Sequence, residues 1–364
     1  MQRLFLALIL TFAAPVIARA ETMDTSVGPL DVTAMAEGLA EPWGLAFLPD
    51  GGFLVTERQG RLSLFGAEGG TGKALAGVPE VYATGQGGLL DVMVPRNFAT
   101  SREVFLSYAR PARFFGGGTA LGRGKLSDDG SQLEGFTVLF ADPESSTSGA
   151  HFGSRIVEAE DGSIFLTVGE RGEGILAQDK TRANGKVIHL ARDGAPLTAI
   201  DGALAGVHSM GHRNPQGATL DGDGRLWVVE HGARGGDELN RVEPGKNYGW
   251  PVISYGVNYD GTRIGLGSGS PGMEQPVHYW DPSIAPSGLM VYSGKMFAEW
   301  AGDFFVGSLK FDYIARLDTD QGFAEEKLQS DQTGRVRDLR EGPDGAIWFL
   351  SVFDGAVYRI STPR

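Results

Sequence analysis

The sequence predicts an all-β protein, a six-bladed β-propeller, and two observations lead to that prediction. Glycine and proline contribute 55 and 18 of the 364 residues, which is too many helix-disrupting residues for an all-helical fold. One pattern, an apolar stretch, an Asp-Gly turn and a second apolar stretch, recurs along the chain. The 41% of hydrophobic and 21% of charged residues are ordinary for a globular protein with a large core.

Each clear copy of the pattern predicts a β-hairpin, because Asp-Gly supplies the positive φ that tight hairpin turns need. The four clear copies are LAFLPDGGFLVTER, IVEAEDGSIFLTVGER, ATLDGDGRLWVVEHG and LREGPDGAIWFLSVF. Their turn glycines are Gly51, Gly162, Gly224 and Gly345. The first and the last interval between these glycines are each about twice the middle one, so each long interval is expected to hide one further unit.

Weaker candidates lie in both long intervals. They are GLLDVMVPRNFATSREVFLSYAR and GLMVYSGKMFAEWAGDFFVGSLKFDYIARL, each with strand-like runs around a more polar turn. Four clear and two weak units make six, each longer than the ~40 to 50 residues of common propeller blades, which leaves room for functional loops. The alternative is a β-sandwich or two smaller β domains, but nothing between residues 30 and 360 resembles a linker.

Residues 1–20, MQRLFLALILTFAAPVIARA, have the features of a signal peptide. Arg3 precedes an apolar run, and residues 18–20 form an A-x-A-like cleavage site. We therefore expect cleavage before Glu21 and an exported, periplasmic protein formed by the single domain 21–364; an uncleaved anchor is the alternative. No later stretch approaches the ~20 apolar residues of a membrane span. With no cysteine in the chain, stability must come from the core or from bound metal.

The charge balance excludes a general nucleic-acid binder. Lys and Arg number 32 against 45 Asp and Glu, a net charge of -13, whereas phosphate contacts need a cationic surface. Local exceptions are Arg335 and Arg337 in TGRVRDL, which on a strand would point to one face. Lys310 and Arg213 also lie in short polar interruptions beside apolar runs. These four cations could converge on a polycarboxylate or phosphate ligand; the alternative is that they are solvated surface charges.

Histidine supplies one candidate base. His151, in GAHFGSRIV, immediately precedes a strand of the repeat and could accept a proton at neutral pH. Glu170, at the end of the same hairpin, could fold back and orient the imidazole; the alternative is a loop histidine bonded to the backbone. His208 and His212 are four residues apart, but Gly211 argues against the helix that would place both on one face, so a zinc site has little support.

One loop could hold a hard cation. The segment EHGARGGDELNRVEPGKNYGWP combines glycines with carboxylates and has no apolar period. Such a loop exposes backbone carbonyls and could present Asp237 and Glu238 to Ca²⁺, which prefers oxygen ligands. It does not match an EF-hand, and a plain surface loop is the alternative.

Together these segments resemble the soluble aldose sugar dehydrogenases that depend on pyrroloquinoline quinone (PQQ), the periplasmic quinoprotein family that includes soluble glucose dehydrogenase. The resemblance runs from EPWGLAFLPDG to SVFDGAVYRI, nearly the whole mature chain. HFGSR, GHRNPQG, the GDELN and KNYGWP segments, SLK and RVRD occur in family order. The resemblance implies a six-bladed propeller with PQQ and Ca²⁺ as cofactors.

The resemblance also implies roles for individual residues. His151 would be the general base that takes the proton of the sugar C1 hydroxyl while hydride passes to the quinone carbon C5, and Glu170 would orient it. Arg213 would hold the quinone oxygen that gains charge. The implied PQQ-binding residues are Gln86, His151, Arg213, Asn214, Gln216, Lys310, Arg335 and Arg337.

The implied metal ligands lie in the cation-binding loop. The carbonyls of Gly232 and Ala233 would coordinate the Ca²⁺ that also grips PQQ, and Glu238 and Tyr248 would bind a second, structural Ca²⁺. Trp280 would lie near the mouth of the site. Ala233 stands where relatives often have Pro, and Glu170 stands where the glucose dehydrogenase branch has Asp, which favours the aldose sugar dehydrogenase branch.

The implied activity is oxidation of aldoses to lactones, with electrons passed to an external acceptor, by a monomer or weak homodimer. Two other classes remain open. A Ca²⁺-dependent propeller hydrolase such as a lactonase would need side-chain carboxylates and Asn around a central metal, with His activating water. A noncatalytic binding propeller would need no base at all. The cation cluster discriminates against the lactonase, which does not require it.

Overall fold

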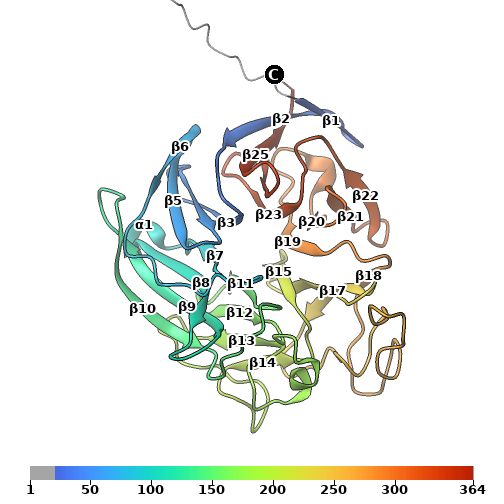
Figure 1. Cartoon of the computed structure of the whole chain (residues 1–364). Helices are drawn as coiled ribbons and strands as arrows, with labels where there is room; N and C mark the ends of the chain where they lie inside the picture. Colours follow the sequence, from blue (N-terminus) through green and yellow to red (C-terminus); the bar gives the residue numbers. More distant parts are fainter. Residues whose placement is uncertain (1–20, 364) are drawn as a thin grey trace, which may run out of the picture.

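The computed structural model describes residues 21–363, so the expected signal peptide lies outside the described residues. In this part of the chain six antiparallel sheets surround a central axis as the blades of a propeller (Figure 1). The predicted six-bladed β-propeller is confirmed, and the β-sandwich and two-domain alternatives are wrong.

In every blade the first strand lies nearest the axis, where it contacts the first strands of both neighbouring blades. Blades 1 and 2 are β3 (Pro42–Phe47), β4 (Phe53–Glu57), β5 (Arg61–Gly66) and β6 (Gly69–Ala74), then β7 (Leu89–Met93), β8 (Glu103–Pro111), β9 (Gly117–Leu126) and β10 (Leu133–Ala141). Blades 3 and 4 are β11 (Gly153–Glu158), β12 (Ile164–Val168), β13 (Lys186–Leu190) and β14 (Val207–Met210), then β15 (Pro215–Leu220), β16 (Leu226–Glu230), β17 (Asp237–Val242) and β18 (His278–Trp280).

Blade 5 is β19 (Pro286–Val291), β20 (Phe304–Ser308), β21 (Ile314–Asp318) and β22 (Ala324–Leu328). Blade 6 is β23 (Val336–Glu341), β24 (Ile347–Ser351), β25 (Ala356–Ser361), β2 (Gly28–Ala36) and β1 (Glu21–Thr25). The short helices described are α1 (Phe98–Ser101), η1 (Gly174–Gln178) and η2 (Ala298–Trp300). None of the helices described within residues 21–363 has the length and apolar content needed to cross a bilayer.

The Asp-Gly turns connect the first two strands of blades 1, 3, 4 and 6, as the repeat predicts. Their glycines all have positive φ, for example 87° at Gly51 and 89° at Gly345, a conformation that glycine adopts without steric cost. The two weaker segments form the corresponding strands of blades 2 and 5, where α1 and η2 stand in place of the turn. The two hidden units are therefore present, and both lack the Asp-Gly signal because a short helix makes the connection.

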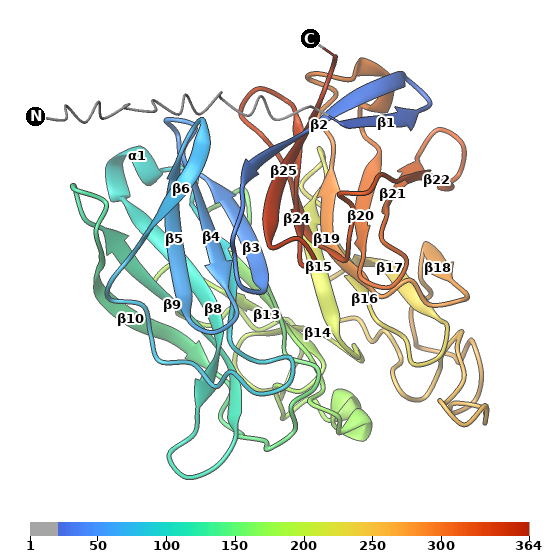
Figure 2. The same cartoon turned by 45° about the horizontal axis from the view of Figure 1, so that its top comes forward.

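The ring closes through blade 6, which contains strands from both ends of the described chain. β2 lies beside β25 and pairs with it in antiparallel fashion (Figure 2). The register places Thr33 opposite Arg359. Opening the ring would break this strand pairing and expose the apolar faces beside it. Because buried apolar area is the dominant stabilising term in folding, the pairing of β2 with β25 stabilises the closed ring.

The hydrophobic core is divided among the interfaces between adjacent blades. Six clusters of buried apolar side chains each join residues of two neighbouring blades, around the whole ring. Between blades 5 and 6, for example, Phe305 and Phe349 are fully buried in one cluster. Each blade is thus covered on both faces, which explains why the innermost strands are almost continuously buried.

A buried ion network joins the innermost strands around the axis. The guanidinium of Arg155 lies 2.7 Å from Asp91 and 3.1 Å from Asp338, and all three side chains are at most 1% exposed. Arg340 pairs with Asp338 at 2.9 Å, and the second oxygen of Asp338 accepts the amide proton of Leu45 at 3.0 Å. The network therefore connects blades 1, 2, 3 and 6.

Replacing Arg155 with Met should lower the free energy of unfolding by about 3 to 5 kcal/mol, because two buried carboxylates then share only the partly exposed Arg340. Denaturant unfolding at neutral pH measures the loss. Arg241→Met is the matched control, because its pair with Glu243 is about half exposed and such pairs contribute about 0 to 1 kcal/mol. Equal losses in both variants would show that the network is not a special source of stability.

Candidate active site

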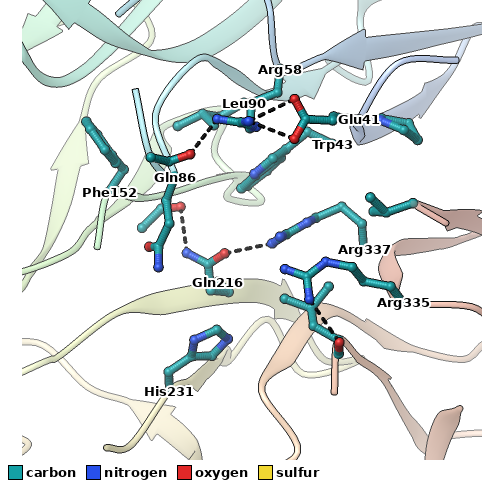
Figure 3. A pocket seen from close by; sticks show the side chains of 15 residues that line it. Glu41, Trp43, Arg58, Gln86, Leu90, Phe152, Gln216, His231, Arg335 and Arg337 are labelled. Atoms are coloured by element: carbon teal, nitrogen blue, oxygen red, sulfur yellow. Dashed lines mark hydrogen bonds and ion pairs between the residues drawn. The ribbon is translucent and has the colours of Figure 1, made fainter. Parts of the chain in front are cut away.

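A pocket opens at the end of the propeller where the innermost strands begin, opposite the Asp-Gly turns. Figure 3 shows the side chains that line it. Its lining comes from the starts of these strands and from the connections that share this end. The lining side chains include Glu41, Trp43, Arg58, Gln86, Leu90, Phe152, Gln216, His231, Leu309, Arg335 and Arg337. Residues from five blades and the connections between them therefore converge on one site.

Three arginines and one carboxylate line the pocket, and the carboxylate, Glu41, pairs with Arg58 at 2.7 Å. Arg337 donates to the side-chain oxygen of Gln216 at 2.9 Å, and Arg335 donates to the carbonyl of Leu309 at 3.1 Å. Within residues 21–363 neither guanidinium forms an ion pair. Burial, followed by repulsion from Arg335, lowers the pKa of Arg337 to about 9. A site that holds cations without carboxylate partners is suited to an anionic ligand.

The two arginines meet in the pocket for a different reason from the one the sequence predicts. β23 begins at Val336, so Arg335 lies before the strand, and it adopts a left-handed φ of 49°. The register of β23 also shifts between Val336 and Asp338. Simple strand alternation is therefore wrong for this pair. The left-handed residue is what redirects the Arg335 side chain to the pocket that Arg337 also lines.

His151 and Glu170 form the predicted pair. The imidazole Nδ1 lies 2.7 Å from Oε1 of Glu170, whose side chain is 3% exposed. The backbone amide of His151 donates to the side-chain oxygen of Gln86 at 2.8 Å, and the other oxygen of Glu170 accepts the amide of Gly172. His151 has a φ of 54°, a costly conformation for a non-glycine residue that the surrounding contacts must maintain. The imidazole thus bonds a carboxylate and not the backbone.

Arg213, Asn214 and Gln216 follow one another beside this pair, as the sequence predicts. One guanidinium nitrogen of Arg213 donates to the carbonyl of Gly232 at 2.5 Å, and its Nε is buried with no partner in the described chain. Trp250 packs against this guanidinium, 5.1 Å from the ring centroid. The amide of Gln216 donates to the side-chain oxygen of Asn214 at 3.0 Å. The orphaned Nε gives Arg213 a free donor.

The glycine-rich loop brings carbonyl groups close together. A Cβ on Gly232 would collide with the carbonyl oxygens of Gly235 and Gly236, so only glycine fits there. Asp237 has another role than the cation ligand considered from the sequence. Its oxygens accept a hydrogen bond from the Ser283 hydroxyl at 2.6 Å. They also accept from the backbone amides of Gly232 at 2.8 Å and Ala285 at 2.7 Å. Asp237 therefore organises the loop, while Gly232 keeps its carbonyl beside Arg213.

Glu238 and Tyr248 occupy different environments. Burial and the nearby Glu230 carboxylate raise the pKa of Glu238 to about 8, which is the situation that a bound divalent cation would relieve. The Tyr248 hydroxyl donates to the carbonyl of Arg241 at 2.7 Å, so it is the backbone of Tyr248 that remains as a candidate ligand. Across the described residues no three His, Cys, Asp or Glu side chains are grouped as metal ligands.

Of the candidate residues, Gln86, Gln216, Arg335 and Arg337 line the pocket, whereas His151, Glu170, Arg213 and Asn214 lie behind its wall. Lys310 and Trp280 lie farther out. Lys310 is exposed, with its ammonium 4.9 Å from the ring centroid of Phe311. Trp280 is buried between blades 4 and 5, where its Nε1 donates to Glu325 at 2.7 Å, so its expected place at the mouth is wrong. His212 bonds Ser209 and Glu230, whereas His208 packs against Phe165 and His189. These two histidines therefore do not form a zinc pair.

Trp43, Arg58, Phe152 and His231 line the pocket but were not singled out from the sequence. A signal for two of them exists in the repeat. The second strands of blades 1, 3 and 4 end at or just before the segments TER, GER and EHG. Each segment contains a buried glutamate: Glu57, Glu170 and Glu230. The residue after the glutamate at the first and third of these positions, Arg58 and His231, lines the pocket. Alignment of the repeats with each other would have found both residues.

His231 is held neutral in the pocket wall. Its Nε2 donates to the carbonyl of Pro286 at 2.8 Å, because a carbonyl can only accept. Burial and the charge of Arg213 lower its pKa to about 3. His151, whose imidazole bonds a carboxylate, is therefore the better candidate for a general base.

Comparison with known proteins gives a consistent match over the propeller. Residues 39–359 match the family model described as glucose/sorbosone dehydrogenase. The chain is 38% identical over 351 residues to the aldose sugar dehydrogenase YliI of Escherichia coli strain K12, covering 93% of this chain and 95% of that protein.

Solved structures extend the likeness to three dimensions. A glucose dehydrogenase is 43% identical with a TM-score of 0.87, covering 91% of this chain and 99% of the other. The PQQ-bound form of an aldose sugar dehydrogenase from Streptomyces coelicolor is 26% identical with a TM-score of 0.76, covering 91% of this chain and 97% of that one.

Arg337→Met should leave the cofactor-free protein as stable as the wild type, or raise its free energy of unfolding by about 1 kcal/mol, because it removes a desolvated cation without an ion-pair partner. Denaturant unfolding measures the change. Arg340→Met, in the same strand, is the control and should lower stability because Asp338 loses a partner. A comparable loss in both variants would mean that the Arg337 charge is satisfied within the empty pocket.

Proposed function

The chain belongs to the glucose/sorbosone dehydrogenase family, and from that premise we propose that it oxidises aldose sugars at C1 to lactones, using PQQ and Ca²⁺ and passing electrons to an external acceptor. One observation carries the proposal. A histidine bonded to a buried carboxylate stands beside a pocket whose arginines, Arg335 and Arg337, have no ion-pair partners in the described chain. A base and an anion site in one place are what this reaction requires.

The residues of the pocket fit PQQ, a planar tricarboxylic quinone. Its carboxylates need cations, which Arg335 and Arg337 supply, and its polar edge needs an amide, which Gln216 supplies from the lining with Asn214 bonded behind it. Trp43 presents an apolar ring at the same pocket. When bound, PQQ supplies the electron-accepting chemistry, and Ca²⁺ would polarise it as a Lewis acid. Lys310, exposed beside Leu309, would contribute to the cofactor's carboxylates from the rim.

His151 is the proposed general base. Glu170 accepts the proton on Nδ1, which leaves Nε2 as the nitrogen that can take the proton of the sugar C1 hydroxyl. As C1 loses hydride and the hydroxyl loses its proton, the imidazole becomes positively charged. The buried carboxylate of Glu170 stabilises that charge and fixes the ring orientation. Gln86 holds the backbone of His151 in its left-handed conformation.

Arg213 is the proposed electrostatic stabiliser. Its guanidinium is already oriented by the carbonyl of Gly232 and the Trp250 ring, and its Nε has no other partner in the described chain. A preoriented donor of this kind stabilises negative charge that develops on an oxygen during the reaction, because it needs no reorganisation.

Backbone carbonyls are the proposed ligands of the Ca²⁺ beside the cofactor, those of Gly232 and Ala233. Hard cations prefer such oxygen ligands, and the crowded carbonyls of this loop match that preference. Glu238, whose charged form is disfavoured by burial and by Glu230, is the proposed ligand of a second Ca²⁺ together with Tyr248.

Export to the periplasm is part of the proposal and is supported by the sequence of residues 1–20. A lactonase, the hydrolytic alternative, would require carboxylates around a central metal. The pocket wall instead has three arginines and a single carboxylate, Glu41, which is paired with Arg58. Asp237 is occupied by the backbone and by Ser283. The geometry therefore favours the oxidoreductase.

The direct test uses the mature protein, residues 21–364, purified without cofactor. PQQ is added with and without Ca²⁺, and bleaching of dichlorophenol indophenol is followed with a panel of aldoses. We expect aldose-dependent bleaching only when both are present, since the cofactor carries the chemistry and the protein positions it. Absence of bleaching together with absence of PQQ binding would overturn the proposal.

His151→Ala should lower kcat by about 10² to 10⁴, the usual contribution of a general base, and should leave the PQQ dissociation constant within a few fold of the wild type. Steady-state kinetics and PQQ titration measure the two effects. His278→Ala, in the outer strand β18 of blade 4, is the control and should keep the wild-type kcat. An unchanged kcat in His151→Ala would remove this residue from the mechanism.

A further inference from the structure

The connection between β8 and β9 forms an exposed aromatic tip, defined here as the arm, residues 110–118. Its sequence is RPARFFGGG, and Phe114 and Phe115 are 79% and 80% exposed. Figure 2 shows the teal tip of this hairpin projecting beyond the blades at the end that also carries η1. Two adjacent phenylalanines left in water are unfavourable for an isolated protein unless another molecule covers them.

The arm is also cationic in an acidic protein. Arg110 and Arg113 are exposed, and within residues 21–363 neither forms an ion pair or a side-chain hydrogen bond. The guanidinium of Arg113 lies 5.4 Å from the ring centroid of Phe114. The whole chain carries a net charge of -13, so the arm is a local patch of opposite sign.

Nearby acids do not neutralise the arm. Glu144 is paired with Arg182. The Oδ2 atom of Asp142 is enclosed, and its Oδ1 accepts the amide of Glu144 at 3.0 Å. The arm therefore presents its two arginines, with two aromatic rings, to an approaching molecule.

The arm adjoins the wall of the pocket. The amide of Gly117 donates to the carbonyl of Ser146 at 3.0 Å, and the return bond is 3.2 Å; the chain runs from Ser146 directly to His151. At the base of the arm, the amide of Tyr82 donates to the carbonyl of Ala109 at 2.7 Å. Tyr82 packs against the cluster that contains the pocket residue Trp43. A molecule bound on the arm would lie beside the mouth of the pocket.

Other exposed apolar side chains lie at the same end. The connection between the second and third strands of a blade always lies at the pocket end, because the strands are antiparallel. Exposed apolar residues on these connections are Phe114, Phe115, Ile175, Phe311 and Phe353. Exposed apolar side chains with polar groups among them are typical of a protein-binding surface.

We propose that the arm is the docking site for an acidic one-electron redox protein that reoxidises the loaded enzyme. The proposal rests on the proposed function, which requires an external acceptor. Oxidation of one aldose to its lactone releases two electrons and two protons; two molecules of the redox protein each take one electron, and the protons pass to water. Arginine and aromatic side chains are the residues that dominate protein interfaces, and the unpaired positive charge selects an acidic partner.

The test compares Arg113→Glu with Lys125→Glu. Lys125 is exposed near the far end of β9, the same strand that begins at the arm. Both variants replace a positive by a negative side chain, so they change the net charge equally. The probes are an acidic and a basic c-type cytochrome with glucose as substrate. We expect Arg113→Glu to lower kcat/KM for the acidic cytochrome about tenfold at low salt, and the difference to vanish at high salt. Lys125→Glu should match the wild type.

A second pair of variants tests the aromatic part. Phe114→Ser with Phe115→Ser should raise KM for the acidic cytochrome about tenfold without changing the salt dependence, because no charge is altered. Leu197→Ala, an apolar side chain 39% exposed in the connection between β13 and β14, is the control. Three results would overturn the proposal. They are a higher kcat/KM with the basic cytochrome, no reduction of the acidic cytochrome, or equal effects of Arg113→Glu and Lys125→Glu on its reduction.

Dye bleaching separates this proposal from the proposed function. All arm variants should bleach dichlorophenol indophenol with glucose at the wild-type rate, since the arm does not contact the reacting atoms. If the wild type bleaches the dye but the variants reduce the cytochrome normally, only the docking proposal fails. If the phenylalanine variants instead lose activity selectively with maltose or maltotriose, the arm binds a second sugar ring and the docking proposal is likewise overturned.

Discussion

The guanidinium of Arg155 is the point on which both the ring and the pocket depend. It bridges Asp91 and Asp338 from different blades, and its Nε donates to the carbonyl of Gln216 at 3.1 Å. It also lies 4.6 Å from the ring centroid of Trp43. The same buried cation that holds the innermost strands together therefore positions two residues that line the pocket.

Arginines near the axis and arginines in the pocket wall have different kinds of partner. Around the axis Arg155 and Arg340 both pair with Asp91 and Asp338, because a buried charge without a partner is costly. In the pocket wall Arg335 and Arg337 have only neutral partners, and the pKa of Arg337 falls accordingly. The first arrangement stabilises the empty protein and the second is costly until an anion binds.

The sequence predicted the six blades because the Asp-Gly turns mark a repeat, and spacing alone located the two blades that lack the turn. It also brought His151 and Glu170 together, since both belong to one hairpin. It failed where local backbone geometry decides the outcome, as at Arg335, whose left-handed φ no strand pattern indicates. It also could not reveal contacts such as that between Arg337 and Gln216, because closure of the ring brings together residues distant in the chain.

Closure of the ring through blade 6 also has a consequence for synthesis. The strands β1 and β2 are made among the first and their partner β25 among the last, so this sheet cannot form while the chain is still being extended. Contacts of such long sequence separation form slowly, because a large loop must first be ordered. Until then the apolar side chains of blade 1 that pack against blade 6 stay exposed. The growing chain therefore remains a substrate for chaperones.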